Sequence, residues 1–199
     1  MEDFGFYLVM TNPKVGYERC CEAAVKAGVK MVQLRMKDVS RDELLEMAKR
    51  LVAITRGSET NLIIDDDASV AEESGADGVH VGQDDMPVEQ ARALIGPDKI
   101  LGLTVTNAAE MTAVNPELVD YVGCGPVFPT ISKDDAPTEL GVQKWGELAA
   151  TCPVPICAIG GLNVERARAV RATGHCDGIA VVSAICAAEN PEQAARELA

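Results

Sequence analysis

The stretch Gly75-Ala76-Asp77-Gly78-Val79-His80-Val81 has an echo near the end of the chain, Gly174-His175-Cys176-Asp177-Gly178-Ile179-Ala180-Val181-Val182. In both copies a glycine suited to the end of a helix comes shortly before a continuous apolar run. Such a run is typical of a strand in a parallel sheet that is covered on both faces. The echo therefore predicts repeated strand-helix units joined by short turns.

Short apolar runs of this kind occur eight times in the 199 residues, at 6–10, 31–34, 62–64, 78–81, 100–105, 118–123, 156–159 and 178–182. Helical periodicity fills segments between them, at 17–27, 41–55, 88–94, 142–150 and 166–172. Eight units predict an α/β protein in which residues 1–199 form a single (β/α)8 TIM barrel domain, because closure leaves no open sheet edge. The alternative is an open doubly wound sheet, although no GxGxxG fingerprint follows the first run.

The amino-acid composition argues against some classes of function. Hydrophobic residues make up 47% of the chain and the net charge is −13, which disfavours binding to nucleic acid or to an anionic membrane surface. The start Met1-Glu2-Asp3 lacks a basic signal and no apolar stretch is long enough for a bilayer, so we expect a cytoplasmic protein. Seven cysteines without a CxxC pair are expected to be reduced and mostly buried. Assembly into a homo-oligomer is left open.

Two cations follow the second predicted strand, in Gln33-Leu34-Arg35-Met36-Lys37. The chemistry of such barrels gathers where strands end. Because side chains alternate in an extended chain, Gln33, Arg35 and Lys37 should point to the same side. Two cations on one rim of the barrel suit a diphosphate ligand. The alternative is an ordinary solvated basic loop.

Carboxylates follow the third and fourth predicted strands, in Asp65-Asp66-Asp67 and Gln83-Asp84-Asp85. Oxygen ligands from two loops, completed by substrate phosphate and water, are how proteins usually hold Mg²⁺. The sequence therefore predicts a phosphate site with a divalent metal. The alternative is that Asp67 and Asp85 cap the helices that follow them.

Later loops offer groups for a second phosphate. The long loop 125–140 contains the hydroxyls of Thr130 and Ser132 and the ammonium of Lys133. Gly160-Gly161 follows the seventh strand and Val182-Ser183 the eighth, where barrels often bind phosphate through backbone N–H groups. His80 lies in an apolar strand and is interpreted as a packing residue, with a general base as the alternative.

In chain order, 33–37, 65–67, 75–85, 120–130, 158–162 and 181–185 together resemble thiamine-phosphate synthase. The resemblance implies a transferase of thiamine biosynthesis that joins a hydroxymethylpyrimidine diphosphate to a thiazole phosphate, whose carboxylated form is left open. The products would be thiamine phosphate and pyrophosphate, with Mg²⁺ as cofactor and phosphorylated small molecules as partners. In the family the diphosphate is thought to leave first, which needs charge stabilisation more than a base.

Carried over by motif position, the resemblance assigns four sets of residues. Arg35, Lys37 and Lys133 would be catalytic, and Asp66 and Asp85 would ligate Mg²⁺. The pyrimidine diphosphate would be held by Gln33, Leu34, Arg35, Met36, Lys37, Asp65, Thr104 and Lys133. The thiazole phosphate would be held by Thr130, Ile131, Ser132, Gly161, Val182 and Ser183.

Three positions depart from the family pattern. Asp65 stands where asparagine is usual, Ser132 replaces a threonine and Met36 replaces an acidic residue. A carboxylate at position 65 would either repel the diphosphate or help to hold the metal, and we expect the second. The competing functions are a related thiazole tautomerase, which needs no diphosphate or metal site, and a non-catalytic thiamine-phosphate binding protein.

Overall fold

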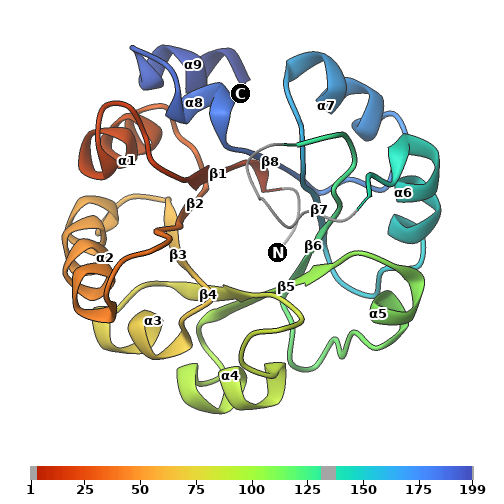
Figure 1. Cartoon of the computed structure of the whole chain (residues 1–199), viewed down its shortest axis with the longest axis horizontal. Helices are drawn as coiled ribbons and strands as arrows, with labels where there is room; N and C mark the ends of the chain where they lie inside the picture. Colours follow the sequence, from red (N-terminus) through yellow and green to blue (C-terminus); the bar gives the residue numbers. More distant parts are fainter. Residues whose placement is uncertain (1–3, 131–137, 199) are drawn as a thin grey trace.

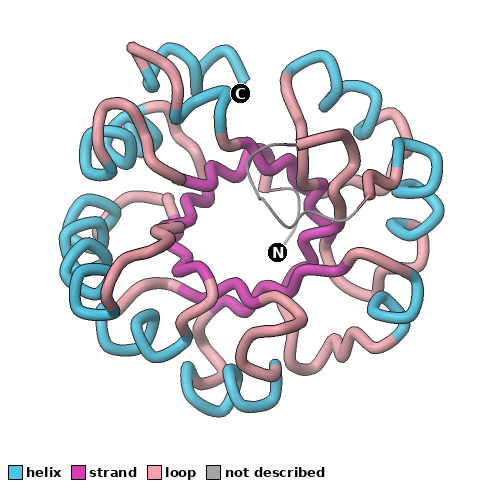
Figure 2. Tube along the Cα trace, viewed as in Figure 1, coloured by secondary structure: helices cyan, strands magenta, loops and turns pink. Residues whose placement is uncertain are grey.

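Eight parallel strands close into a barrel within the residues that the computed structural model describes, which are 4–130 and 138–198 (Figures 1 and 2). The ring is sealed by β1, whose Leu8 lies opposite Val32 of β2 and Val181 of β8. The predicted barrel is confirmed and the open-sheet alternative is wrong. The strands are β1 (Gly5–Met10), β2 (Met31–Leu34), β3 (Asn61–Asp65), β4 (Gly78–Val81), β5 (Ile100–Val105), β6 (Tyr121–Cys124), β7 (Ile156–Ala158) and β8 (Gly178–Val181).

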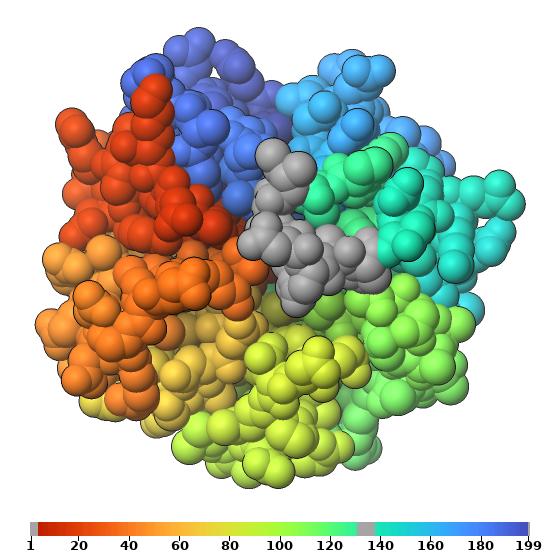
Figure 3. All heavy atoms as spheres, viewed as in Figure 1, coloured from red at the N-terminus to blue at the C-terminus, as the bar shows by residue number. Residues whose placement is uncertain are grey.

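Helices surround the barrel, and the segments follow one another around the molecule in chain order (Figures 1 and 3). Helix α9 packs beside α1, so it covers the junction between the last unit and the first. In the described ranges no helix has the length and apolar character needed to cross a membrane. The helices are α1 (Tyr17–Lys26), α2 (Arg41–Thr55), α3 (Ala68–Ser74), α4 (Val88–Ile95), α5 (Ala108–Thr112), α6 (Gly141–Ala149), α7 (Val164–Arg171), α8 (Ser183–Cys186) and α9 (Pro191–Leu198).

The echo in the sequence has a structural cause at the end of the barrel where strands begin. Asp77, directly before β4, accepts the backbone N–H of Leu62 in β3 at 2.7 Å. Asp177, directly before β8, accepts the N–H of Ile156 in β7 at 2.8 Å. Asp120, directly before β6, accepts the N–H of Leu101 in β5 at 2.7 Å. Each of these strand-start aspartates (Asp77, Asp120 and Asp177) therefore ties its strand to the one before it.

Two apolar cores flank the barrel wall. The larger one lies between the strands and the helices and includes the buried Trp145 of α6, the only tryptophan of the chain. The Trp145 indole N–H donates to the carbonyl of Cys124 at 3.0 Å, which satisfies its polar group. The smaller core fills the barrel itself with Phe4, Tyr7, Met31, Ile63, Tyr121, Cys157 and Ala180. This filling leaves the two ends of the barrel as the places where chemistry can occur.

Candidate active site

Charged side chains meet at the end of the barrel where β2, β3 and β4 finish. These three strands are neighbours in the ring. Arg35 and Lys37 follow β2, Asp65 and Asp66 mark the end of β3, and Asp85 lies in the loop after β4. The barrel thus brings to one rim the cations and carboxylates that the sequence predicted on separate loops.

Ion pairs hold the cations against carboxylates of β3 and its loop. Arg35 Nε lies 3.2 Å from a carboxylate oxygen of Asp65. Lys37 Nζ lies 2.6 Å from Asp66 and 3.6 Å from Asp65. The side chains of Arg35 and Asp65 are 15% and 12% exposed, whereas that of Lys37 is 46% exposed. The Arg35–Asp65 pair is therefore the better shielded from water, and the solvated-loop alternative is wrong for Arg35.

Burial changes the acidity of Asp65. Loss of solvent raises the pKa of its carboxyl to about 7, the negative charge of Asp66 also raises it, and Lys37 and Arg35 oppose the shift. Asp65 can therefore exchange a proton near neutral pH. Its carboxylate faces the two cations, and its expected role at the metal stays a prediction.

The capping alternative is confirmed for Asp67 and wrong for Asp85. The carboxylate of Asp67 accepts the N–H of Val70 at 2.9 Å and caps α3. Helix α4 begins after Pro87, which makes no side-chain cap. The Asp85 carboxylate instead accepts the N–H of Gly82 at 2.7 Å and so closes its own loop. Asp67 therefore serves as a helix cap, whereas Asp85 lies at the rim and does not cap a helix.

Asp66 and Asp85 present a pair of oxygen donors that suits a divalent cation. Their side chains are hydrogen-bonded neighbours: burial and this contact raise the pKa of Asp85, whereas the contacts with Lys37 and Asp85 lower the pKa of Asp66 despite its burial. Two carboxylates this close repel each other unless a proton or a cation lies between them. Residues 4–130 and 138–198 hold no group of three or more His, Cys, Asp or Glu side chains suited to a metal. A cation here would need further ligands from substrate and water.

The loop after β7 has glycines where side chains would collide with the loop after β6. A Cβ at Gly161, where φ is +64°, would lie 2.4 Å from the carbonyl oxygen of Pro129. A Cβ at Gly160 would lie 2.4 Å from Cβ of Pro126, and the Gly160 carbonyl accepts the N–H of Phe128 at 3.2 Å. The two loops pack backbone against backbone, which is compatible with the predicted phosphate contact at Gly161.

The remaining predicted residues divide by position. Leu34 is fully buried in the outer core, so a ligand could meet only its backbone, whereas Met36 is half-buried against the same core. Gln33 is buried inside the barrel, and Thr104 of β5 is half-buried. Val182 and Ser183 lie where β8 passes into α8. Thr130 is half-buried, and Ile131, Ser132 and Lys133 lie outside the described residues.

Three further residues support the site without having been predicted. The hydroxyls of Tyr7 and Tyr121 lie 2.9 Å apart inside the barrel, below the rim. Arg166 donates to the carbonyl of Gly161 at 2.6 Å and lies over the ring of Phe128, 4.7 Å from its centroid. Arg166 thus links the loops after β6 and β7. The contact with Gly161 is local, but the sequence does not show that Phe128, from the loop after β6, lies beneath the guanidinium.

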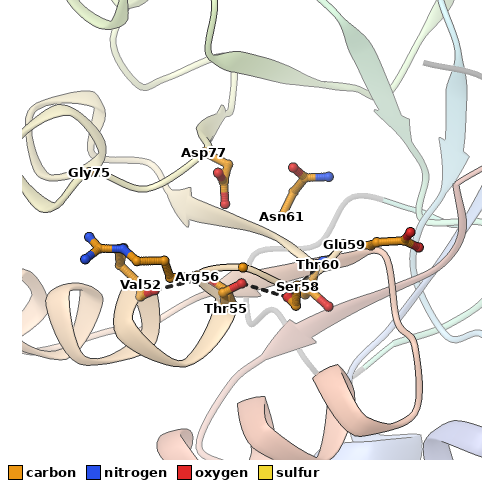
Figure 4. Close-up of a pocket in the computed structure, with 10 residues that line it drawn as sticks. Val52, Thr55, Arg56, Ser58, Glu59, Thr60, Asn61, Gly75 and Asp77 are labelled. Atoms are coloured by element: carbon orange, nitrogen blue, oxygen red, sulfur yellow. Dashed lines mark hydrogen bonds between the residues drawn. The ribbon is translucent and has the colours of Figure 1, made fainter.

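A hollow of about 300 Å³ lies at the opposite end of the barrel, beside the starts of β3 and β4 and the end of α2 (Figure 4). Two of its polar side chains have structural partners: Asp77 accepts the N–H of Leu62, and the Thr60 hydroxyl donates to the carbonyl of Val29 at 2.7 Å. In barrels of this type that end serves stability. We therefore place the candidate active site at the charged rim.

Comparison with known proteins identifies the family of the chain. A family model described as thiamine monophosphate synthase matches residues 6–185. The thiamine-phosphate synthase of Azorhizobium caulinodans is 44% identical, covering 98% of this chain and 93% of its own length, and that of Laribacter hongkongensis is 42% identical, covering 100% and 95%. The solved thiamine phosphate pyrophosphorylase from Pyrococcus furiosus has a TM-score of 0.89 at 34% identity, covering 99% of this chain and 94% of that one. A match of this extent in sequence and structure shows that the chain belongs to the thiamine-phosphate synthase family.

Proposed function

We propose that the rim at the ends of β2, β3 and β4 is where this chain joins a hydroxymethylpyrimidine diphosphate to a thiazole phosphate, giving thiamine phosphate and pyrophosphate. Membership of a family of transferases supports the reaction class. One observation carries the assignment to this site: Arg35 and Lys37 meet the carboxylates of Asp65 and Asp66 next to Asp85. Cations that are already paired with acids can exchange those partners for a diphosphate.

The proposed reaction moves electrons toward the leaving group. The bond between the pyrimidine methylene carbon and the diphosphate oxygen breaks first, and its electron pair leaves on that oxygen. The thiazole nitrogen then donates its lone pair to form the new C–N bond, and the positive charge stays on the thiazolium ring. Arg35, Lys37 and Lys133 are the proposed catalytic residues, because fixed positive charge stabilises the departing oxygen. No protein base is needed in this scheme.

Mg²⁺ is the proposed cofactor, with Asp66 and Asp85 as its protein ligands. The fit rests on the contact between two oxygen donors that would otherwise repel each other. When bound, the metal supplies further positive charge beside the diphosphate. Lys37, 2.6 Å from Asp66, would then be free to turn from the carboxylate toward the phosphoryl oxygens.

Two sets of residues would bind the substrates. Around the pyrimidine diphosphate we place the side chains of Gln33, Arg35, Lys37, Asp65, Thr104 and Lys133 and the backbone of Leu34 and Met36. Around the thiazole phosphate we place Thr130, Ile131, Ser132, Gly161, Val182 and Ser183. Arg166 supports the second set through the carbonyl of Gly161.

The test is to incubate the full chain with both substrates and Mg²⁺ and to measure pyrophosphate and thiamine phosphate together. Equal amounts of the two products are expected. Arg35→Met should lower the rate by about 10²- to 10³-fold, as losses of oxyanion stabilisers do. Arg168→Met, at an exposed position of α7, is the matched control and should keep the rate.

The competing functions predict other results. A tautomerase would change the thiazole alone, and a binding protein would retain thiamine phosphate without forming it. Absence of pyrophosphate from the wild-type chain would therefore overturn the proposed function.

A further inference from the structure

We propose that His80 is a positioning residue that sets the hydroxyl of Thr104 as a hydrogen-bond donor toward the substrate diphosphate. It would act through a buried relay formed by Gln33, Tyr7, Tyr121, His80 and Thr104. The role of Thr104 at the diphosphate rests on the proposed function, whereas the relay rests on contacts inside the barrel.

Four short contacts make up the relay. Gln33 Nε2 lies 2.7 Å from the Tyr7 hydroxyl, which lies 2.9 Å from the Tyr121 hydroxyl. The Tyr121 hydroxyl lies 2.8 Å from His80 Nδ1, and His80 Nε2 lies 2.8 Å from Thr104 Oγ1. The chain of contacts crosses the barrel interior and ends at the rim. It connects two of the residues assigned to the pyrimidine diphosphate, Gln33 and Thr104.

The barrel wall is shaped around this relay. A Cβ at Gly102 of β5 would lie 2.3 Å from Cζ of Tyr121 and 2.4 Å from Nδ1 of His80. A Cβ at Gly123 of β6 would lie 3.1 Å from Cε1 of His80. Two strand positions thus lack side chains where the tyrosine ring and the imidazole pack together. His80 is therefore held in place on the sides of its ring as well as through its nitrogens.

The donors can be followed from one end of the relay to the other. The Gln33 amide donates to the Tyr7 oxygen, so the Tyr7 proton goes to Tyr121 and the Tyr121 proton goes to His80 Nδ1. His80 then carries its own proton on Nε2 and donates it to Thr104. Burial raises the pKa of both Tyr7 and Tyr121, so both phenols keep the protons that this order requires.

The consequence lies at the rim. A Thr104 hydroxyl that accepts from His80 has its own proton available to donate outward, as a phosphate oxygen requires. The reverse order would need Gln33 to present its carbonyl oxygen to Tyr7 and would have Thr104 donate its proton to His80. Thr104 would then offer lone pairs to the diphosphate and repel it.

The first experiment measures which nitrogen of His80 carries the proton. The full chain contains two histidines, so ¹⁵N-histidine labelling with His175→Gln as the assignment variant isolates the signals of His80. A protonated Nε2 with an unprotonated Nδ1 is expected in the ligand-free protein. A proton on Nδ1, alone or on both nitrogens, would overturn the relay.

The second experiment is a double-substitution cycle in kcat/KM for the pyrimidine diphosphate. Tyr121→Phe and Thr104→Val should each lower kcat/KM by about tenfold, the value of one charge-assisted hydrogen bond, with the KM for the thiazole phosphate unchanged. The double variant should be no worse than Thr104→Val alone, because the Tyr121 hydroxyl acts on the substrate only through the Thr104 hydroxyl, which that variant already lacks. Losses that multiply in the double variant would contradict the positioning role.

The matched control is Phe4→Leu. Phe4 packs edge-on against the rings of Tyr7 and Tyr121 but has no polar group in the relay. Any loss that it causes through looser packing should multiply with that of Thr104→Val. If the wild-type chain forms no thiamine phosphate, the proposed function fails while the labelling experiment still decides the relay. If the chain is active with a proton on Nδ1, the relay fails alone.

Discussion

Aspartates occupy both ends of the barrel, and their partners differ. The strand-start aspartates each receive a backbone N–H of a neighbouring strand, at 2.7 to 2.8 Å. At the opposite rim, Asp65 pairs with Arg35 and Lys37, and Asp66 meets both Lys37 and Asp85. The first group binds backbone donors that belong to the fold, and Asp120 also pairs with Arg92 at 2.6 Å. The second pairs with side chains, including other carboxylates, and a ligand can displace such partners.

The difference explains why the same residue type serves stability at one end and chemistry at the other. A carboxylate whose hydrogen bond to a backbone N–H joins two strands gains one satisfied contact, whereas the Asp85 carboxylate accepts an N–H of its own loop and also meets Asp66. Carboxylates that are buried near one another store unfavourable charge, as the raised pKa of Asp65 and of Asp85 indicates. Clusters of the second kind are therefore the ones to search for ligands.

The sharpest test of this contrast is Asp85→Ala. We expect Mg²⁺-dependent turnover to fall by at least about 10³-fold, because a proposed metal ligand is lost from a site with few others. The melting temperature should change little, since Asp85 is half-buried and its main fold contact is one N–H of its own loop. Asp84→Ala, next to it and exposed, is the control and should keep full activity. Retained activity with an unchanged Mg²⁺ requirement in Asp85→Ala would count against the metal assignment.

Asp65→Asn tests whether the buried charge of Asp65 destabilises the fold, through the pH dependence of the free energy of unfolding. Burial raises the pKa of the Asp65 carboxyl to about 7 in the folded protein, whereas its pKa in the unfolded chain is the usual 3.8. The folded state binds more protons between these values, so wild-type stability should fall as pH rises through this window and level off above it. Urea unfolding should show Asp65→Asn close to wild type near pH 4 and more stable at pH 8, on the order of 4 kcal/mol. The same slope in both proteins would refute the raised pKa.

The same variant addresses the role of Asp65 during turnover. If its carboxylate helps to hold the metal, Asp65→Asn should raise the Mg²⁺ concentration needed for half-maximal rate. If it only competes for Arg35 and Lys37, the substitution should tighten pyrimidine-diphosphate binding and leave the Mg²⁺ titration unchanged. The two measurements have different readouts, so one series of rates decides between them.

Lys133→Ala probes a cation assigned by resemblance. The rate should fall by about 10²-fold while thiazole-phosphate affinity stays close to wild type, because the charge should serve the departing diphosphate. Rapid-quench rates and a binding titration measure the two quantities. Lys144→Ala, at an exposed position of α6, is the control. Equal losses in rate and affinity would contradict the assignment.

The smallest expected effect is at the other end of the barrel. Asp177→Ala should lower the free energy of unfolding by about 1 to 2 kcal/mol, because the N–H of Ile156 loses its acceptor. The rate of catalysis should not change. Asp177→Asn keeps an acceptor oxygen and should lose less. A drop in kcat without a change in stability would break the contrast between the two ends.

Local pattern was sufficient for the elements but not for contacts across the barrel. Strands Met31–Leu34, Gly78–Val81 and Ile100–Val105 have the predicted bounds, because continuous apolar runs mark buried parallel strands. The run predicted at 118–123 begins as a strand only at Tyr121, since the Asp120 before it is used to bind Leu101.

The charged residues of the site could be predicted from the sequence, but the contacts inside the barrel could not. Charges at strand ends are local signals, so Arg35, Asp66 and Asp85 could be placed on one rim before the structure was known. The buried relay could not be predicted, because Tyr7 and Tyr121 are 114 residues apart in the sequence. Each of them looks like an ordinary core residue of its strand. His80, interpreted as a packing residue, does pack in the interior but also bonds through both ring nitrogens.

The position of Trp145 has an optical consequence. It is the only tryptophan of the chain, it is buried in α6, and its indole donates to Cys124 at the end of β6. When the protein is excited at the red edge of its absorption, its emission therefore comes from Trp145 alone. This residue is hydrogen-bonded to the end of β6, from which the loop with Pro126, Pro129 and Thr130 continues. Adding thiazole phosphate or pyrophosphate separately, and following that emission, would show without any label which of the two ligands reaches this side of the barrel.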